Sequence, residues 1–308
     1  MANSQNETSN LTSVIASSSV GTLIEWYDFY IFGSLADQIS KNLFPPDQTT
    51  SAYLSTLAIF AIGFIVRPFG ALFFGRLGDL IGRKYTFLVT LVLMGGSTFM
   101  IGLVPSYAMI GWGAPILAMI LRILQGLALG GEYGGAATYV AEHAPIGKRG
   151  FWTSWIQTTA TLGLFVSLFV IIITRQIIND TDKFDSWGWR IPFLLSIVLV
   201  AISFVIRMRM KESPLFTKLK TAGQTSTNPL KESFAKKENL KMVLLALFGA
   251  TCGQGVVWYT GQFYAQSFLQ KTCMMDGTQS NQWIGWALVF ATPFFVFFGG
   301  YPIKLGVK

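Results

Sequence analysis

The sequence predicts an all-α integral membrane protein built as a helix bundle. Hydrophobic residues make up 52% of the 308 residues, whereas charged residues make up only 12%. Apolar runs of roughly 20 residues, the length that crosses a bilayer, recur along the chain. Most of the 23 Lys and Arg residues fall between these runs on one side of the membrane. That side is expected to face the cytoplasm, which also places the N-terminus there.

Eight spans are expected, and one basic segment divides them. The spans are Val14–Ala36, Ala52–Phe74, Tyr85–Val104, Ala114–Val140, Phe151–Ile173, Ile191–Met208, Met242–Leu269 and Gln282–Phe298. The predicted organisation is therefore a six-helix unit over residues 1–208, a cytoplasmic basic linker over 209–241, and the start of a second unit over 242–308. The linker is expected to be a solvated tether near anionic lipid.

Several function classes are disfavoured by the composition. The net charge of +8 follows membrane sidedness, so it does not indicate nucleic-acid binding. Cys252 and Cys273 form no disulfide framework or metal pattern. The sequence contains no nucleotide-binding loop and no hydrolase motif, so we expect neither an enzyme nor a cofactor. The expected partners are membrane lipid and a small organic solute, with a single chain as the functional unit.

Two carboxylates, Glu25 and Asp28, lie in the middle of the first predicted span. A charge at the bilayer centre costs several kcal/mol, so such a residue usually faces a wet cavity or a partner. Three positions apart, the two acids share one helical face. We therefore predict a functional site on this face. The alternative is a shallow helix whose acids reach the lipid headgroups.

The depths of the buried charges predict two pairs. At about 1.5 Å per residue, Asp28 and Arg122 each lie about 12 Å from the outer ends of their spans. Their opposite charges are thus expected near the midplane. Arg67 and Glu132 both fall about 24–27 Å from the outer face, which predicts a second buried charge pair. Glu25 is left without a partner, so we expect it to exchange a proton.

The segment after the second span reads GRLGDLIGRK, from Gly75 to Lys84. Its glycines, including Gly82, permit a tight turn between helices. Asp79 is expected just before the third helix, where a carboxylate can cap backbone N–H groups. A faint copy of this pattern at 299–308 indicates that the last two spans begin a second copy of the first unit.

Polar and aromatic residues interrupt the seventh span, which indicates a cavity wall. The alternative is hydrogen bonding and packing between helices. The candidate substrate-binding residues are Gln254, Trp258, Tyr259 and Gln262 in this span, Gln157 in the fifth span, and Arg122 and Gln125 in the fourth.

Several motifs resemble those of the major facilitator superfamily. Gly75–Lys84 is similar to its cytoplasmic motif G-x-L-x-D-x-x-G-R-[KR], and Arg122–Gly126 is similar to its R-x-x-Q-G motif. Three further stretches resemble the metabolite:proton symporter group, which includes proline/betaine, α-ketoglutarate, shikimate and citrate carriers. They are Glu25–Phe29 (EWYDF), Gly130–Gly134 (GGEYG) and Trp187–Phe193 (WGWRIPF).

This resemblance implies a twelve-helix transporter with two six-helix halves and a cavity between them that opens alternately to each side. About eight of the twelve spans are present, so we expect the C-terminal part to be missing. The resemblance also implies proton symport, with Glu25, Asp28 and Arg122 as coupling residues. The cytoplasmic gate that it implies consists of Gly75, Asp79, Gly82, Arg83 and Lys84.

The expected function is therefore secondary active transport across the bacterial inner membrane, in which a proton moves with an organic acid or zwitterion. Two alternatives stay open, namely a passive facilitator of the same fold and a non-transporting sensor or truncated product. The role of Arg122 also stays open, since it can bind the substrate or serve coupling alone.

Overall fold

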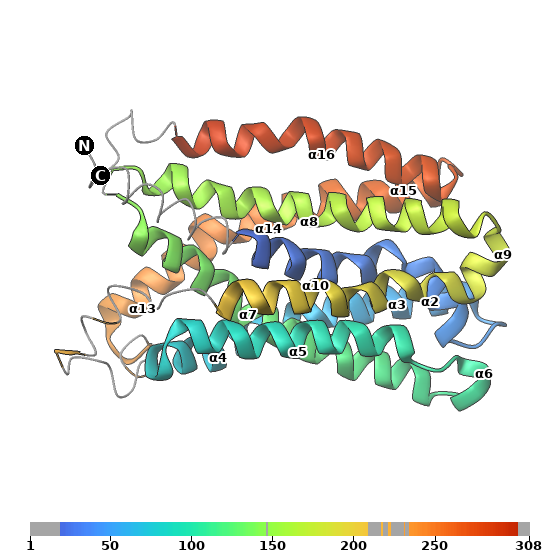
Figure 1. The fold of residues 1–308 in the computed structure, drawn as a ribbon, viewed down its shortest axis with the longest axis horizontal. Coiled ribbons are helices and arrows are strands. Elements are labelled where there is room, and N and C mark those ends of the chain that lie inside the picture. Colours follow the sequence, from blue (N-terminus) through green and yellow to red (C-terminus); the bar gives the residue numbers. More distant parts are fainter. Residues whose placement is uncertain are drawn as a thin grey trace.

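The computed structural model describes residues 19–145, 147–208, 217, 221–222, 231 and 234–300, without the side chains of Tyr133, His143, Ala250, Thr251 and Gln254. The described chain is almost entirely helical (Figure 1). A first helix covers residues 19–34. The elements after it are α2 (Ala36–Leu43), α3 (Thr49–Ile65), α4 (Arg67–Ile81), α5 (Arg83–Leu103), α6 (Tyr107–Ile110), α7 (Gly113–His143), α8 (Arg149–Ile178), α9 (Thr181–Lys183), the π-helix η1 (Phe184–Gly188), α10 (Arg190–Met208), α13 (Lys237–Leu244), η2 (Leu245–Thr251), α14 (Cys252–Tyr259), η3 (Thr260–Tyr264), α15 (Ala265–Lys271) and α16 (Gly277–Gly300).

Six of the described helices are long and apolar enough to cross a membrane. They are Thr49–Ile81, Arg83–Leu103, Gly113–Glu142, Arg149–Ile178, Arg190–Met208 and Gly277–Gly300. Each coincides with a predicted span, which confirms the all-α membrane class. The other two predicted spans are also helical where described, but they are interrupted. A turn follows residue 34 in the first, and the π-helical turns η2 and η3 divide the seventh.

The helices run side by side along the long axis of the molecule (Figure 1). The turn between α4 and α5, the end of α10 and α13 lie at one end, at the left of Figure 1. The short helices α6 and α9 lie at the other end. We call these the inner end and the outer end, because the Lys and Arg distribution predicts that the first faces the cytoplasm.

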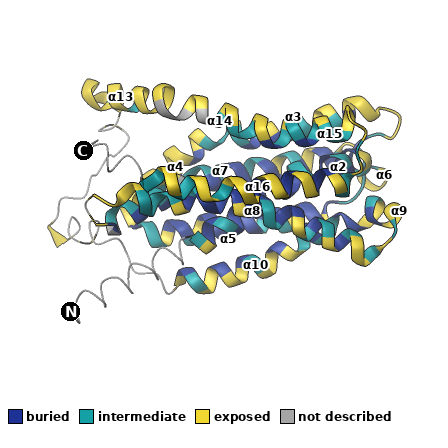
Figure 2. Ribbon diagram, turned by 90° about the horizontal axis from the view of Figure 1, so that it is seen from above, coloured by how far each residue is buried: buried dark blue, intermediate teal, exposed yellow. Residues whose placement is uncertain are grey.

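The helix of residues 19–34 forms the centre of the core. Its residues Tyr27, Phe29 and Tyr30 have no exposed surface, although this helix is rich in polar groups. Around it, α7 packs against α4 and α5, α5 packs against α10, and α8 packs against α16. Figure 2 shows the buried residues along the middle of the bundle, whereas α13 has no buried residue.

Glycines let α3 and α4 lie directly against α7. A Cβ atom on Gly70 would come within 2.0 Å of the Leu127 carbonyl oxygen, and one on Gly126 within 2.3 Å of the Gly63 carbonyl oxygen. A Cβ atom on Gly130 would come within 2.2 Å of the Arg67 carbonyl oxygen. Small residues are what permit such backbone contact between membrane helices. This contact fixes the position of Arg67 relative to α7.

The turn before α5 is shorter than the sequence predicts. Residues 75–81 continue α4 instead of forming a loop, and the chain reverses at Gly82, whose φ of 111° is in the region that favours glycine. Asp79 is therefore inside a helix, and it does not cap α5. The turn can be this short because α4 and α5 are antiparallel neighbours that need only one residue to reverse direction.

The predicted division into two units with a linker stays a prediction. Most of the linker at 209–241 and the end of the faint repeat at 301–308 lie outside the described residues.

Candidate functional site

A cavity of about 390 Å³ lies between the first helix, the α3–α4 junction, α7, α8 and α14. We call it the central cavity. Four aromatic side chains, one arginine and one glutamine in its lining carry the argument below. They are Trp26, Phe64, Trp258, Tyr259, Arg67 and Gln157. Three of these, Gln157, Trp258 and Tyr259, are among the predicted substrate-binding residues, so the structure gathers residues from distant spans around one space.

Arg67 enters this cavity from the start of α4, where the helix restarts one residue before Pro68. Its Nη1 donates a hydrogen bond to the Tyr259 hydroxyl oxygen at 3.2 Å. Its guanidinium carbon lies 4.2 Å from the ring centre of Phe29 and 4.4 Å from that of Phe64. Aromatic faces attract a cation in this geometry. Arg67 Nε and Nη2 are buried without a hydrogen-bond partner among the described residues.

The predicted pair of Arg67 with Glu132 is wrong. Glu132 instead contacts Arg207 from α10, and its Oε2 accepts a hydrogen bond from the Thr90 hydroxyl at 2.8 Å. Equal depth did not imply contact, because the side chains project from α4 and α7 in different directions. Arg67 turns toward the first helix and α14.

Arg122 lies at the level of Phe29, as its depth predicts, and is completely buried. Its Nη1 donates to the Phe29 carbonyl oxygen at 3.2 Å and to Gln125 Oε1. Its guanidinium carbon lies 3.7 Å from the ring centre of Phe29. Gln125 Nε2 in turn donates to the Asp28 carbonyl oxygen at 2.9 Å and to the Thr98 hydroxyl at 2.7 Å. Gln125 therefore joins three helices.

The predicted ion pair between Asp28 and Arg122 is absent from the ion pairs of the described chain. Arg122 instead reaches the main chain of the first helix and three aromatic faces. Asp28 is 1% exposed, and its Oδ1 has no hydrogen-bond partner within the described part. Asp28, rather than Glu25, is thus the carboxylate of the first helix without a cationic partner there.

Glu25 belongs to a second cluster nearer the inner end. Nη2 of Arg207 contacts both Glu25 and Glu132, so two carboxylates share one guanidinium. Arg207 Nη1 also donates to the Phe87 carbonyl oxygen at 2.9 Å. All three charged side chains are at most 3% exposed. We call Glu25, Glu132 and Arg207 the inner triad.

Sequence reasoning missed Arg207, because it stands at the cytoplasmic end of its predicted span, where a basic residue is expected to face the cytoplasm. The signal that could have found it is its place inside the predicted span Ile191–Met208, less than one turn before the span ends. A basic residue there can point back into the bundle as well as out to the cytoplasm.

The predicted gate residues lie together at the inner end. Arg83 pairs with Glu142 of α7 at 3.0 Å, and Lys84 donates to the Met208 carbonyl oxygen at 2.8 Å. A second cavity of about 230 Å³ is lined by Gly75, Asp79 and Arg83 together with glycines of α7. These contacts tie α5 to α7 and α10, which is compatible with a gate. The gating role itself stays a prediction.

The remaining candidates of the seventh span divide into three cases. Trp258 lines the central cavity and donates from its indole nitrogen to the Tyr30 hydroxyl at 3.1 Å. Gln262 is buried, and its Oε1 has no hydrogen-bond partner in the described chain. The side chain of Gln254 is outside the described residues. A role for these residues in substrate binding stays a prediction.

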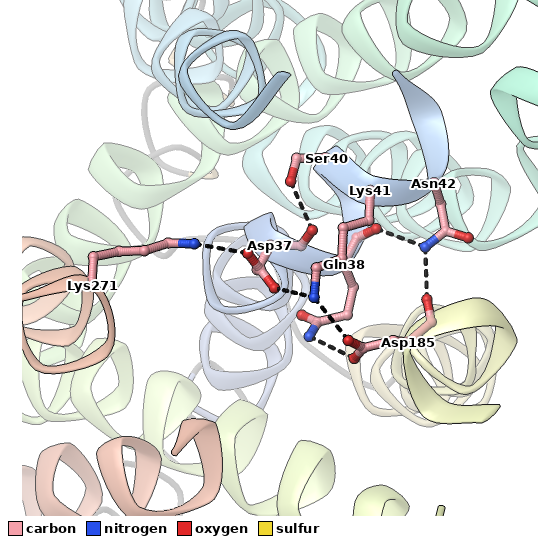
Figure 3. A network of polar contacts seen from close by, with 7 residues as sticks. All are labelled: Asp37, Gln38, Ser40, Lys41, Asn42, Asp185 and Lys271. Atoms are coloured by element: carbon pink, nitrogen blue, oxygen red, sulfur yellow. Dashed lines mark hydrogen bonds and ion pairs between the residues drawn. The ribbon is translucent and has the colours of Figure 1, made fainter. Parts of the chain in front are cut away.

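At the outer end, a polar network joins α2, η1 and α15 (Figure 3). Asp37 pairs with Lys41 at 2.8 Å and with Lys271 at 2.9 Å, and Lys41 also pairs with Asp185 at 2.9 Å. Although partial burial raises the pKa of Asp37, the hydrogen bonds from the two lysines outweigh it and hold this pKa below its usual value. The network thus connects α2 and η1 to α15, the helix at the end of the seventh predicted span.

Apolar helices that surround a cavity with an arginine in its wall fit a membrane transport protein. The model of the sugar (and other) transporter family matches residues 14–246. The chain therefore belongs to this family, within the major facilitator superfamily, whose members are membrane transporters rather than enzymes. This confirms the superfamily that the motifs indicated.

Two similar proteins are the inner membrane metabolite transport protein YhjE of Escherichia coli and a putative metabolite transport protein of Haemophilus influenzae. The first is 41% identical over 76% of this chain and 53% of its own length; the second is 36% identical over 96% and 70%. The chain is accordingly a multi-pass protein of the bacterial inner membrane. The crystal structure of a D-xylose–proton symporter shares the fold, with a TM-score of 0.66 and 20% identity over 92% of this chain and 67% of that one.

Carriers of the kinds that the sequence motifs resemble are also represented among the relatives. They include the proline/betaine transporter of Salmonella typhimurium and the α-ketoglutarate permease and shikimate transporter of Escherichia coli, at 40%, 34% and 42% identity over 67%, 87% and 64% of this chain. The chain covers 41%, 60% and 45% of these three proteins, so it spans about half the length of most of the curated relatives it matches.

Proposed function

We propose that this protein moves a small organic metabolite across the inner membrane together with a proton, by alternating access. The observation that carries the proposal is Asp28. It is a carboxylate in the core of the bundle, 1% exposed, with one oxygen that has no hydrogen-bond partner in the described chain. A membrane protein keeps such a group where it serves a proton or ion pathway.

In the proposed cycle, Asp28 takes up a proton from the outer side and releases it on the inner side. Neutral Asp28 lets the bundle close around the bound solute, since no uncompensated charge then has to be buried. Arg122 and Gln125 contact the main chain of residues 28 and 29, so they hold the acid in place during the change. Moving one charge through the membrane potential supplies about 2.3 kcal/mol per 100 mV, which is enough to drive accumulation.

Two further sets of residues support the cycle. We propose that the gate residues Gly75, Asp79, Gly82, Arg83 and Lys84 close the inner end, and that Gln157, Gln254, Trp258, Tyr259 and Gln262 contact the solute. One relative is named as a metabolite transport protein, and two others are named as carriers of α-ketoglutarate and of shikimate, which supports an organic solute.

The test is proton flux into liposomes that contain the reconstituted chain and a trapped pH dye. A panel of carboxylates and zwitterions is added outside. We expect internal acidification with at least one solute, and loss of this signal in Asp28→Asn with residual solute exchange. The matched control is Asp47→Asn, which removes an exposed carboxylate at the outer end.

A passive facilitator would give solute uptake without acidification, in wild type and in Asp28→Asn alike. That result would contradict proton coupling and the role of Asp28. Acidification that persists in Asp28→Asn but disappears in Glu25→Gln would move the coupling site to the inner triad.

A further inference from the structure

We propose that the central cavity binds the carboxylate group of an anionic organic solute and that Arg67 is its anchor. This deepens the proposed function, because it rests on the cavity being the site of the transported solute. It names the charge of that solute and the residue that selects it.

The first argument is the charge of the cavity. Among the described residues that line it, Arg67 is the one charged side chain. Arg67 forms no ion pair with an acid of the described chain, and Glu132, its predicted partner, is held by Arg207 in the inner triad. A half-buried cation whose Nε and Nη2 are buried without an anionic partner is costly, and a bound carboxylate would remove that cost.

The second argument is that one edge of the Arg67 guanidinium has no hydrogen-bond partner in the described chain. Nη1 of Arg67 is occupied by the Tyr259 hydroxyl, whereas Nε and Nη2 are buried without a hydrogen-bond partner in the described part of the chain. In arginine, Nε and Nη2 form one edge whose two N–H bonds are parallel. This edge matches the two oxygens of a carboxylate in a bidentate hydrogen bond.

The third argument is that Arg67 is held in position before any solute arrives. Its guanidinium lies against the rings of Phe29 and Phe64, and a Cβ atom on Gly130 would already collide with its carbonyl oxygen. Contact with aromatic faces attracts the cation without using its N–H groups. The side chain is therefore held in place while Nε and Nη2 have no hydrogen-bond partner among the described residues, so a carboxylate that reaches them meets a group already in position, which lowers the entropy cost of binding.

The walls of the cavity define the rest of the solute. Trp26, Phe64, Trp258 and Tyr259 supply apolar faces, and Gln157 supplies a neutral polar group. The volume of about 390 Å³ is at the small end of the usual range for ligand pockets. These features fit a compact carboxylic acid with an apolar or cyclic body, and the described lining offers no acid for a second, positive group.

The test measures binding by the chain in detergent, through the fluorescence of Trp26 and Trp258 in the cavity wall. The probes are cyclohexanecarboxylate and its neutral analogue cyclohexanecarboxamide, which have nearly the same shape. We expect the carboxylate to bind at least about tenfold more tightly than the amide. In Arg67→Gln the carboxylate should bind about 10- to 100-fold more weakly, with amide binding unchanged.

Two further variants make the result specific. Arg67→Lys keeps the charge but loses the bidentate edge, so it should recover only part of the affinity. Arg76→Gln removes an exposed arginine from the same helix and should change nothing. Thermal unfolding of each variant establishes that the fold is retained.

The proposal is overturned if the carboxylate binds no better than the amide, or if Arg67→Gln leaves carboxylate affinity unchanged. Tighter binding of glycine betaine, independent of Arg67, would also overturn it, since it would mean that the aromatic walls select a cation. The binding assay involves no proton gradient. Arg67-dependent binding without acidification of liposomes would therefore leave this inference standing while the proposed symport failed.

Discussion

The first helix carries two buried charge clusters that are built in opposite ways. At Phe29, the guanidinium groups of Arg67 and Arg122 lie 4.2 Å and 3.7 Å from the same ring centre. One turn away at Glu25, two carboxylates share the single guanidinium of Arg207. The first cluster thus has cations held by aromatic faces, whereas the second has more carboxylates than cations.

The difference shows how a membrane protein can keep arginines with unused N–H groups apart from arginines whose ion pairs hold helices together. An aromatic face stabilises a cation by about 2 kcal/mol or more when desolvated, but it neutralises no charge and uses no N–H group. The arginines at Phe29 consequently each keep two guanidinium nitrogens, Nε and Nη2, without a hydrogen-bond partner in the described chain. In the inner triad the carboxylates occupy the guanidinium directly, so that cluster joins the first helix, α7 and α10.

The largest expected effect comes from removing the arginine of the inner triad. Arg207→Met leaves Glu25 and Glu132 buried without a cation, and breaking a buried ion pair in this way costs about 3–5 kcal/mol. Arg67→Met removes a cation that has no carboxylate partner in the described chain, so it should cost clearly less. Thermal unfolding in detergent measures both.

Equal losses of stability in Arg207→Met and Arg67→Met would contradict this distinction between the two clusters. A rescue experiment tests the distinction further. Adding Glu25→Gln and Glu132→Gln to Arg207→Met should restore much of the lost stability, because it removes the unpaired charges. A triple variant as unstable as Arg207→Met would mean that packing, rather than charge, is what Arg207 contributes.

A smaller effect is expected where α7 supports Arg67. Gly130→Ala would place a Cβ atom 2.2 Å from the Arg67 carbonyl oxygen, so the two helices must separate, at a cost of about 1–3 kcal/mol. We also expect weaker carboxylate binding, because the anchor moves. Gly134→Ala is the matched control, since its Cβ atom would meet nothing within 4 Å. It should be neutral or slightly stabilising.

Equal effects of the two alanine substitutions, in unfolding temperature and in carboxylate affinity, would contradict this account of Gly130. The pair is informative because both glycines line the central cavity. Only one of them is in contact with the backbone of the residue proposed to bind the solute.

The sequence predicted the class and the spans because hydrophobic length and Lys and Arg asymmetry act over whole helices. It also placed Asp28 and Arg122 at a similar depth, since depth follows from counting residues. It did not predict which charges meet. Contact depends on the rotation of each helix about its axis, and this is set by packing such as the glycine contacts of α7. Glu132 therefore meets Arg207 rather than Arg67.

Two other features were outside the reach of pattern reasoning for related reasons. The turn at Gly82 is one residue long because α4 extends to Ile81, and helix ends are poorly marked when glycines occur on both sides of the boundary. Which edge of Arg67 has no partner in the described chain depends on which nitrogen the Tyr259 hydroxyl accepts from, a detail of side-chain orientation that residue spacing does not encode.

The smallest effect is expected at the outer end, where the charged pairs are exposed. Asp37 and Lys271 have side chains that are 30% and 50% exposed. A double-mutant cycle of Asp37→Asn and Lys271→Ala, measured by thermal unfolding, should give a coupling energy of about 0.2–1 kcal/mol that falls with added salt.

The pKa of Asp37 is lowered in the folded protein, so this stabilisation is present above the usual pKa of the carboxyl and is lost only as pH falls through the lowered value. The coupling should consequently be constant between about pH 5 and pH 8. Solvent exposure would not explain why this network is weaker than the buried inner triad if the coupling energy were as large as the loss of stability in Arg207→Met. A coupling energy that disappeared between about pH 5 and pH 8 would contradict the account in the same way.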